Sequence, residues 1–130
     1  MKRTHTTGAT YYISSTGSDS SNGQLANPFK TIQHGINAAW AGDTVIVYPG
    51  TYVEDVNYNG KNIVLASRIL KTEDEAYIDS TIIEGTVYID DGVNDAVLFS
   101  GFTITGSHNN RGIECTSDDS VRISHVKVIG

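Results

Sequence analysis

A 24-residue repeat near the end of the chain constrains its fold more than any other feature of the sequence. Residues 96–106 read AVLFSGFTITG, and residues 120–130 read SVRISHVKVIG. In this alignment the apolar positions coincide: Val97 with Val121, Phe99 with Ile123, Phe102 with Val126 and Ile104 with Val128. Each unit therefore predicts a strand, a two-residue corner and a second strand.

A repeat of this length is typical of a parallel β-helix, in which every coil lays its strands over those of the coil before it. Alternate apolar residues then fill the interior, whereas Arg122 and Lys127 point into water. Because a slip of one residue would bury these charges, the pattern sets the register. Further short strands are predicted at 45–48, 63–65, 82–83, 87–89, 97–99 and 102–104.

One helix is predicted before these strands. Asn27 is its N-cap, Pro28 its first residue and Gly42 its left-handed end. Its apolar stripe follows the helical period: Phe29, Ile32, Ile36 and Trp40. The first coil of a β-helix exposes unpaired strand edges and an open core, so we expect the helix to cover that end. The alternative is a helix packed on the side of a sheet.

These patterns divide the chain into three parts. Residues 1–10 are polar and predicted to be frayed. Residues 11–42 form the N-terminal cap, and residues 43–130 hold about three to four coils.

Several segments resemble the opening of pectate-lyase-like right-handed β-helix proteins, a secreted bacterial and archaeal family. They are YYI at 11–13, GSD at 17–19, NPFKTIQ at 27–33, AGDTV at 41–45 and PGTY at 49–52. The resemblance implies an all-β, right-handed parallel β-helix with a capping helix, and a secreted or cell-surface location. Family lyases carry their catalytic base and calcium ligands on middle coils, and no such motif matches here. Residues 68–79 are longer and more charged than the family turn, which predicts a protruding loop.

Charge and composition exclude some partners. The net charge is −6 and no cluster of lysine or arginine is present, which argues against nucleic acid and anionic membranes as partners. No run approaches the roughly 20 apolar residues of a membrane span. The first residues, MKRTHTTGATYY, have no apolar stretch like that of a signal peptide.

Tyrosines and two glutamates are candidates for carbohydrate binding. Exposed aromatic rings stack on sugars, and the candidate rings are Tyr48, Tyr52, Tyr58 and Tyr88. Glu84 and Glu114 are predicted to point outward from equivalent strands, about 5 Å apart, where each carboxylate would perturb the other. The alternatives are half-buried strand tyrosines and an ordinary surface pair of carboxylates.

An acidic turn is a candidate calcium site. Asp90, Asp91 and Asp95 surround a Gly-Val-Asn turn, although aspartate and asparagine are also ordinary turn residues. Asp118 and Asp119 are interpreted as a solvated turn. The histidines have no zinc-ligand spacing: His34, His108 and His125. Cys115, the single cysteine, is predicted to be buried and unreactive.

These observations leave three hypotheses of function. The first is a non-catalytic structural or interaction segment of an extracellular β-helix protein. It pairs with further coils of a parent chain, or with itself as a dimer or head-to-tail filament, through an open end that carries Val126 and Val128. The second is part of a polysaccharide lyase or glycoside hydrolase whose catalytic coils lie beyond residue 130. The third is a carbohydrate-binding module.

Overall fold

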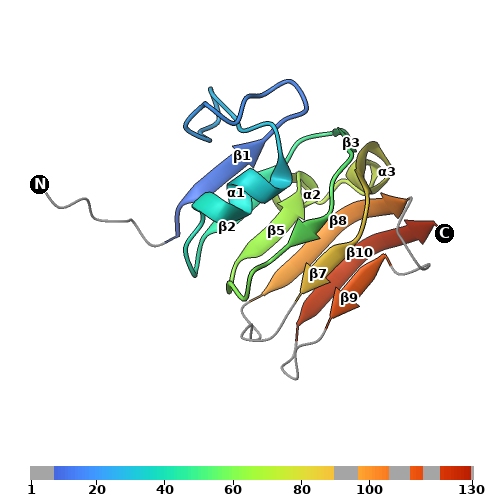
Figure 1. Ribbon diagram of the computed structural model, residues 1–130. Coiled ribbons are helices and arrows are strands. Elements are labelled where there is room, and N and C mark those ends of the chain that lie inside the picture. Colours follow the sequence, from blue (N-terminus) through green and yellow to red (C-terminus); the bar gives the residue numbers. More distant parts are fainter. Residues whose placement is uncertain (1–7, 90–96, 106–111, 116–120, 130) are drawn as a thin grey trace, which may run out of the picture.

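The computed structural model describes residues 8–89, 97–105, 112–115 and 121–129, and it is mostly β-structure with few, short helices (Figure 1). The strands are β1 (Thr10–Ile13), β2 (Thr44–Val47), β3 (Gly50–Tyr52), β4 (Val56–Asn57), β5 (Val64–Ser67), β6 (Thr81–Glu84), β7 (Val87–Ile89), β8 (Leu98–Thr105), β9 (Ile113–Cys115) and β10 (Arg122–Ile129). The helices are α1 (Ile32–Ala38), α2 (Ile69–Thr72) and α3 (Ala76–Ser80).

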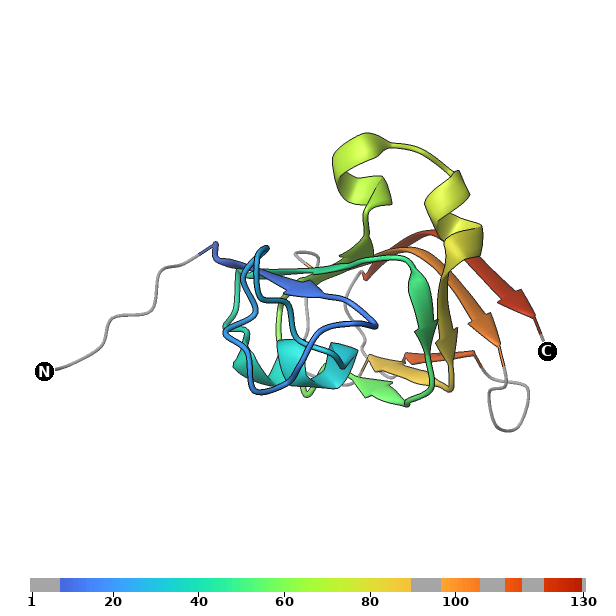
Figure 2. The same ribbon diagram turned by 90° about the horizontal axis from the view of Figure 1, so that it is seen from above.

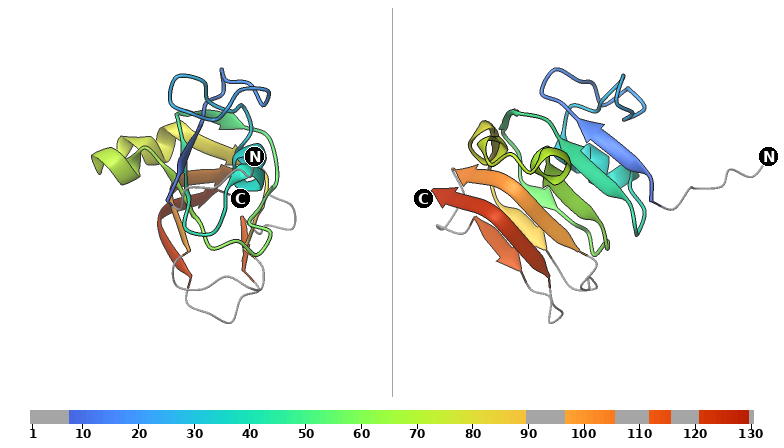
Figure 3. Two further views of the ribbon diagram at one scale, coloured as in Figure 1. Left: turned by 90° about the vertical axis from the view of Figure 1, so that its left-hand side faces the viewer. Right: turned by 180° about the vertical axis from the view of Figure 1, so that it is seen from behind.

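All of these strands pair in parallel, in two sheets. The larger sheet has the order β1-β2-β5-β8-β6-β3, with β10 also paired to β8, and the smaller sheet has the order β4-β7-β9. The strands β2, β3 and β4 therefore pair with β5, β6 and β7 in turn, so the same three-strand unit recurs along the chain. Figure 3 shows the neighbouring strands β1, β2, β5, β8 and β10 side by side from one end of the molecule to the other.

Strand β8 is long because it serves two faces. Its first half pairs with β5 and its second half with β6, and the bend between them lies at Gly101, where φ is +90°. Strand β10 repeats this path, with Arg122 opposite Leu98 and Ile129 opposite Thr105. Both pairings have the 24-residue offset read from the sequence, so the predicted register of the repeat is confirmed.

The core consists of columns of buried side chains that run across successive units. One column joins Val45, Leu65 and Phe99 through paired positions, and another joins Tyr52, Ile83 and Ile104. A third joins the buried Val56 and Val87 to Ile113, which is partly buried. Each fully buried aliphatic or aromatic side chain contributes roughly 1.5–3 kcal/mol, so these columns fix the stacking of the units.

Helix α1 is shorter than predicted, and it begins at Ile32 rather than at Pro28. Its N-cap is Thr31, whose hydroxyl accepts a hydrogen bond from the His34 amide at 3.3 Å. Phe29 lies before the helix in a bridge to Ile13, because its amide donates to Tyr12 and its carbonyl accepts from Ser14. The predicted N-cap at Asn27 is therefore wrong, since strand β1 holds this segment extended.

The predicted stripe of α1 is only partly correct. Ile32 and Ile36 are fully buried, and Phe29 is buried from its position outside the helix. Trp40 lies beyond the C-cap residue Ala39 and is 58% exposed, so its predicted place over the core is wrong. The helix ends at Ala38, where Lys61 binds the carbonyls of Ile36 and Ala39.

The protrusion predicted at 68–79 is present, and it is helical. Helices α2 and α3 form a hairpin that stands out from the larger sheet, on the side away from β4, β7 and β9 (Figure 2). The hydroxyl of Thr103 donates to the Ile78 carbonyl at 2.7 Å, and Lys127 Nζ lies 2.6 Å from an Asp79 carboxylate oxygen. Helix α3 therefore touches both β8 and β10.

Candidate functional site

The side chain of Gln33 occupies the position of a neighbouring strand beside β4. Its Oε1 accepts a hydrogen bond from the Asn57 amide at 2.7 Å, and its Nε2 donates to the Asn57 carbonyl at 2.9 Å. Nε2 also donates to Asn37 Oδ1 at 3.1 Å. An unpaired strand edge invites pairing with other chains. Here a side-chain amide satisfies the edge that a preceding strand would otherwise cover.

Two charged residues hold α1 at its two ends. The Glu54 carboxylate accepts hydrogen bonds from the amides of Ile32 and Gln33, both at 3.0 Å. Burial raises the pKa of Glu54, against these hydrogen bonds, which lower it. The Lys61 ammonium group donates to the last carbonyls, those of Ile36, Asn37 and Ala39, at 2.8–3.1 Å. Glu54 follows β3 and Lys61 follows β4, so one unit of strands positions the whole helix.

The edge formed by β10 is different, because it exposes side chains of the core columns. Ile123 is 41% exposed and Val128 is 48% exposed, whereas their partners on β8, Phe99 and Ile104, are fully buried. Ile129 is 50% exposed. The β10 edge therefore presents apolar side chains at positions whose counterparts in the preceding unit are buried.

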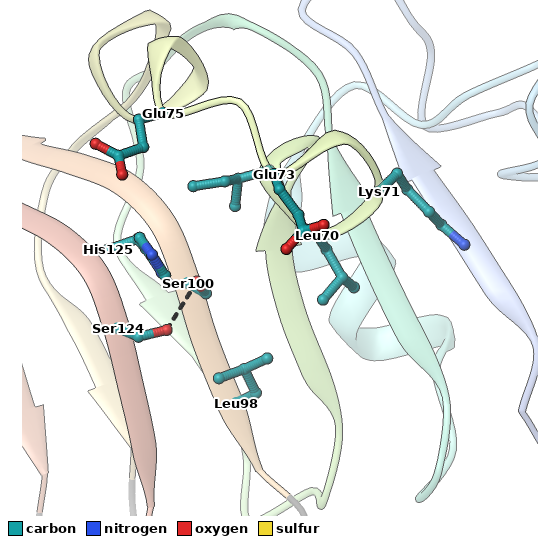
Figure 4. Close-up of a pocket in the computed structure, with 9 residues that line it drawn as sticks. Leu70, Lys71, Glu73, Glu75, Leu98, Ser100, Ser124 and His125 are labelled. Atoms are coloured by element: carbon teal, nitrogen blue, oxygen red, sulfur yellow. Dashed lines mark hydrogen bonds between the residues drawn. The ribbon is translucent and has the colours of Figure 1, made fainter.

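A pocket of about 450 Å³ lies between the α2–α3 hairpin and strands β8 and β10 (Figure 4). Its lining consists of Ile69, Leu70, Lys71, Glu73, Glu75, Leu98, Ser100, Ser124 and His125. The hydroxyls of Ser100 and Ser124 lie 3.0 Å apart in a hydrogen bond. His125 has a left-handed backbone, with φ at 54°. The pocket thus combines an apolar floor with carboxylates, hydroxyls and an imidazole.

Two of the tyrosines predicted to bind sugar are buried. Tyr58 is fully buried and donates its hydroxyl to the Leu98 carbonyl at 2.9 Å, and burial raises its pKa well above the usual value. Tyr52 is 4% exposed and donates to the Tyr48 carbonyl at 2.7 Å. A sugar cannot reach either ring, so the prediction is wrong for both. Tyr48 and Tyr88 are half-buried.

The predicted pair of Glu84 and Glu114 does not form. Glu84 lies opposite Thr105 in the larger sheet, and Glu114 lies opposite Tyr88 in the smaller one. The two carboxylates are therefore on different sheets. The prediction failed because a corner separates β6 from β7, and the strand equivalent to β6 is the second half of β8.

The predicted calcium ligands Asp90, Asp91 and Asp95 lie outside the described residues, as do His108, Asp118 and Asp119. Among the residues that the structure describes, no group of three or more His, Cys, Asp or Glu side chains is placed to hold a metal ion. Cys115 is exposed, so the prediction that it is buried is wrong. Cys115 lies opposite the buried Ile89, but its strand β9 is the last of the smaller sheet.

Sequence reasoning did not identify Gln33 as the residue that closes the β4 edge, nor Glu54 and Lys61 as the residues that hold α1. Their bonds join residues 21–25 positions apart, and no spacing rule links a glutamine side chain to a distant strand. The pocket had a partial signal, since its hairpin is the insertion at 68–79. Its other wall comes from the repeat itself, through Leu98, Ser100, Ser124 and His125.

The fold and these edges define a mostly β protein built on parallel sheets. Residues 15–59 match a family described as "Protein of unknown function (DUF1565)", which is associated with right-handed β-helix proteins. This segment contains α1 and the strands β2 to β4, including Gln33 and Glu54.

The uncharacterized protein YwoF of Bacillus subtilis (strain 168) is 43% identical over 51 residues. Those residues are 38% of this chain and 11% of YwoF, so the match spans about a ninth of that relative. No solved structure matches the chain. Within the described residues, none of the helices has the length and apolar character needed to span a membrane.

Proposed function

We propose that this chain is the capped end of a right-handed parallel β-helix and acts as a structural and interaction module of an extracellular protein. In this proposal α1 closes one end of the solenoid, and the β9–β10 edge accepts a further parallel strand layer. The observation that carries the proposal is the contrast between the two edges. Side-chain hydrogen bonds satisfy one of them, and the other exposes apolar side chains.

The contacts of α1 support its role as the cap. Gln33 pairs with the edge of β4, while Ile32 and Ile36 are fully buried against the first core residues. Glu54 and Lys61 fix the helix at both ends. An uncapped first coil of a solenoid would expose its backbone edge and its core together, and α1 covers both.

The recurring three-strand unit supports the solenoid. Strands β2, β3 and β4 are followed by β5, β6 and β7, and each pairs in parallel with its counterpart. The match of residues 15–59 to a family associated with right-handed β-helix proteins favours the right-handed sense.

The β9–β10 edge offers a measurable gain from docking. Ile123, Val128 and Ile129 are about half exposed, and covering what remains exposed of them is worth about 2–4 kcal/mol. Backbone hydrogen bonds of a parallel neighbour add to this value. The natural occupant is a further coil, and in its absence a second copy of the chain takes the place. We therefore expect the 130-residue chain to self-associate through this edge.

Sedimentation velocity over a range of protein concentrations tests this expectation. The double variant Ile123→Lys/Val128→Lys places two charges on the edge, and we expect it to remain monomeric. The matched control Leu25→Lys/Val53→Lys changes two exposed apolar residues outside this edge, which are 60% and 75% exposed. It should associate like the unchanged chain. A chain that stays monomeric at high concentration, or equal association of all three proteins, would contradict the proposal.

Binding of a polysaccharide is a second candidate, favoured by one row of side chains. Asn57, Tyr88 and Glu114 occupy paired positions on β4, β7 and β9, and Tyr88 is half-buried. A half-exposed ring beside polar side chains is the arrangement that contacts sugar faces and hydroxyls. Titration with polygalacturonate should perturb the Tyr88 resonances and fail with Tyr88→Ala. Equal binding by both proteins would exclude this row as the site.

A further inference from the structure

The pocket under the α2–α3 hairpin has the dimensions of a small-molecule site. Its volume of about 450 Å³ falls in the range of about 300–1,000 Å³ found for ligand sites in proteins. One wall is the hairpin, and the other is the bend shared by β8 and β10 (Figure 4). The pocket is separate from the cap and from the row that contains Tyr88.

Two carboxylates, those of Glu73 and Glu75, line this pocket. Figure 4 shows Glu73 and Glu75 on the hairpin wall of the pocket, and the ammonium end of Lys71, which also lines the pocket, directed away from both carboxylates. Arg68 instead lies over the Tyr48 and Tyr77 rings, at 4.8 and 5.8 Å. In the part of the chain that the structure describes, neither carboxylate forms an ion pair with a basic side chain, and Lys127 of β10 is paired with Asp79 on α3.

The pocket also contains two serine hydroxyls and an imidazole. Ser100 is 96% buried, and its hydroxyl shares one hydrogen bond with that of Ser124. A hydroxyl oxygen has two lone pairs, so each serine can accept a further hydrogen bond. A neutral imidazole at His125 offers one ring nitrogen as an acceptor. The floor is apolar, with Leu98 opposite Leu70, and Leu70 is 40% exposed at the pocket. A matching ligand therefore has an apolar stem and several donors.

The backbone at the bend of β8 and β10 has a left-handed conformation in both strands. Gly101 occupies the bend in β8 with φ at +90°, and a side chain there would collide with Ser67 and Ile69. His125 follows 24 residues later at the same bend with φ at 54°, a conformation that costs a non-glycine residue about 1–2 kcal/mol. Strain of this kind concentrates at ligand sites. Of these two bend residues, the strained His125 lines the pocket.

We propose that this pocket binds a primary ammonium group carried on a short alkyl chain. The ammonium group donates to Glu73 and Glu75 and to the serine hydroxyl oxygens, and the alkyl chain covers Leu70 and Leu98. An ammonium group has three donors and no acceptor, which complements the two carboxylates and the serine hydroxyl oxygens. The source is either a free diamine or the lysine side chain of a peptide.

Isothermal titration calorimetry of the 130-residue chain with 1,5-diaminopentane tests the proposal. The uncharged probe 1,5-pentanediol has the same length, and we expect no binding from it. The variant Glu73→Gln/Glu75→Gln should weaken diamine binding roughly tenfold or more, because it removes two charge-assisted hydrogen bonds. The matched control Asp74→Asn/Glu84→Gln removes the same charge outside the pocket, since the Asp74 side chain binds the Ala76 amide. It should bind as the unchanged chain does.

Nuclear magnetic resonance spectra of the same samples locate the binding, through shifts at His125 and Leu98. Nα-acetyl-lysine amide keeps the free ε-ammonium group of a lysine in a peptide. If it binds more tightly than the diamine, the ligand is a peptide, and the reverse order indicates a free diamine. The proposal is overturned if neither amine binds, or if pentanediol or glucose binds as well as the diamine. Equal weakening in both double variants would also overturn it, because the effect would then come from overall charge.

Discussion

The side chain of Gln33 gives the sharpest test of how the β4 edge is closed. Replacing it in Gln33→Met keeps the length of the side chain and removes both hydrogen bonds to Asn57. Each intramolecular hydrogen bond contributes about 0.5–1.5 kcal/mol, so the free energy of unfolding should fall by about 1–3 kcal/mol. For a chain of this size that corresponds to a drop in Tm of roughly 4–12 °C.

Urea unfolding followed by fluorescence measures this loss. The chain has a single tryptophan, Trp40, which lies two residues beyond the end of α1 and reports on the helix. Hydrogen exchange at the Asn57 amide measures the lost bond itself, and its protection should fall. The control Gln24→Met makes the same chemical change in an exposed loop side chain and should leave both measurements unchanged.

The two measurements together separate a closed edge from a merely well-packed helix. If Gln33→Met unfolds with the same free energy as Gln24→Met, the bonds to Asn57 contribute nothing that water does not supply. If stability falls while the Asn57 amide keeps its protection, the loss arises elsewhere in α1. Either outcome would contradict the role given to Gln33.

Three further substitutions test other parts of the structure. Tyr58→Phe removes the hydroxyl that binds the Leu98 carbonyl, and urea unfolding should show a loss of about 1–3 kcal/mol; no loss would mean that the carbonyl finds another donor. Gly101→Ala should cost about 2 kcal/mol or more in thermal unfolding, because φ is +90° and the methyl group meets Ser67. Burial raises the folded-state pKa of Glu54 above its ordinary 4.5, so its favourable contribution is full below pH 4.5 and is lost as pH rises through the folded pKa. The unchanged chain should therefore gain stability relative to Glu54→Gln on acidification from neutral pH, and a parallel pH profile would show that the shift is absent.

The repeat could be predicted from the sequence because the alternation of apolar and polar residues leaves few possible registers for the two strands. Arg122 and Lys127 cannot face a packed interior, and the apolar residues between them must, so the pairing of β10 with β8 follows from the pattern alone. The start of α1 was not readable in this way. Pro28 and Phe29 have favourable helix-start positions, but hydrogen bonds to β1 hold Phe29 extended, and local preference yields to such tertiary contacts.

The candidate sugar site failed for a geometric reason. A tyrosine in a short strand faces either the core or water, and the choice depends on where the corner between strands falls. Tyr52 and Tyr58 precede and follow such corners and point inward, whereas Tyr88 lies in mid-strand between two buried neighbours and is half-buried. The corner between β6 and β7 likewise separates Glu84, on β6, from the smaller sheet that contains Glu114. The positions of the corners depend on how the whole three-strand unit packs. A single repeat in the sequence does not specify that packing.

Helix α3 has a mechanical consequence for the last strand. Through Thr103 it binds β8, and through the contact of Asp79 with Lys127 it binds β10, so it spans two successive layers from outside. An exposed ion pair of this kind adds about 0–1 kcal/mol to equilibrium stability. The contact also couples the hairpin mechanically to β10. A force applied at Ile129 therefore loads the α2–α3 hairpin together with the β8–β10 ladder.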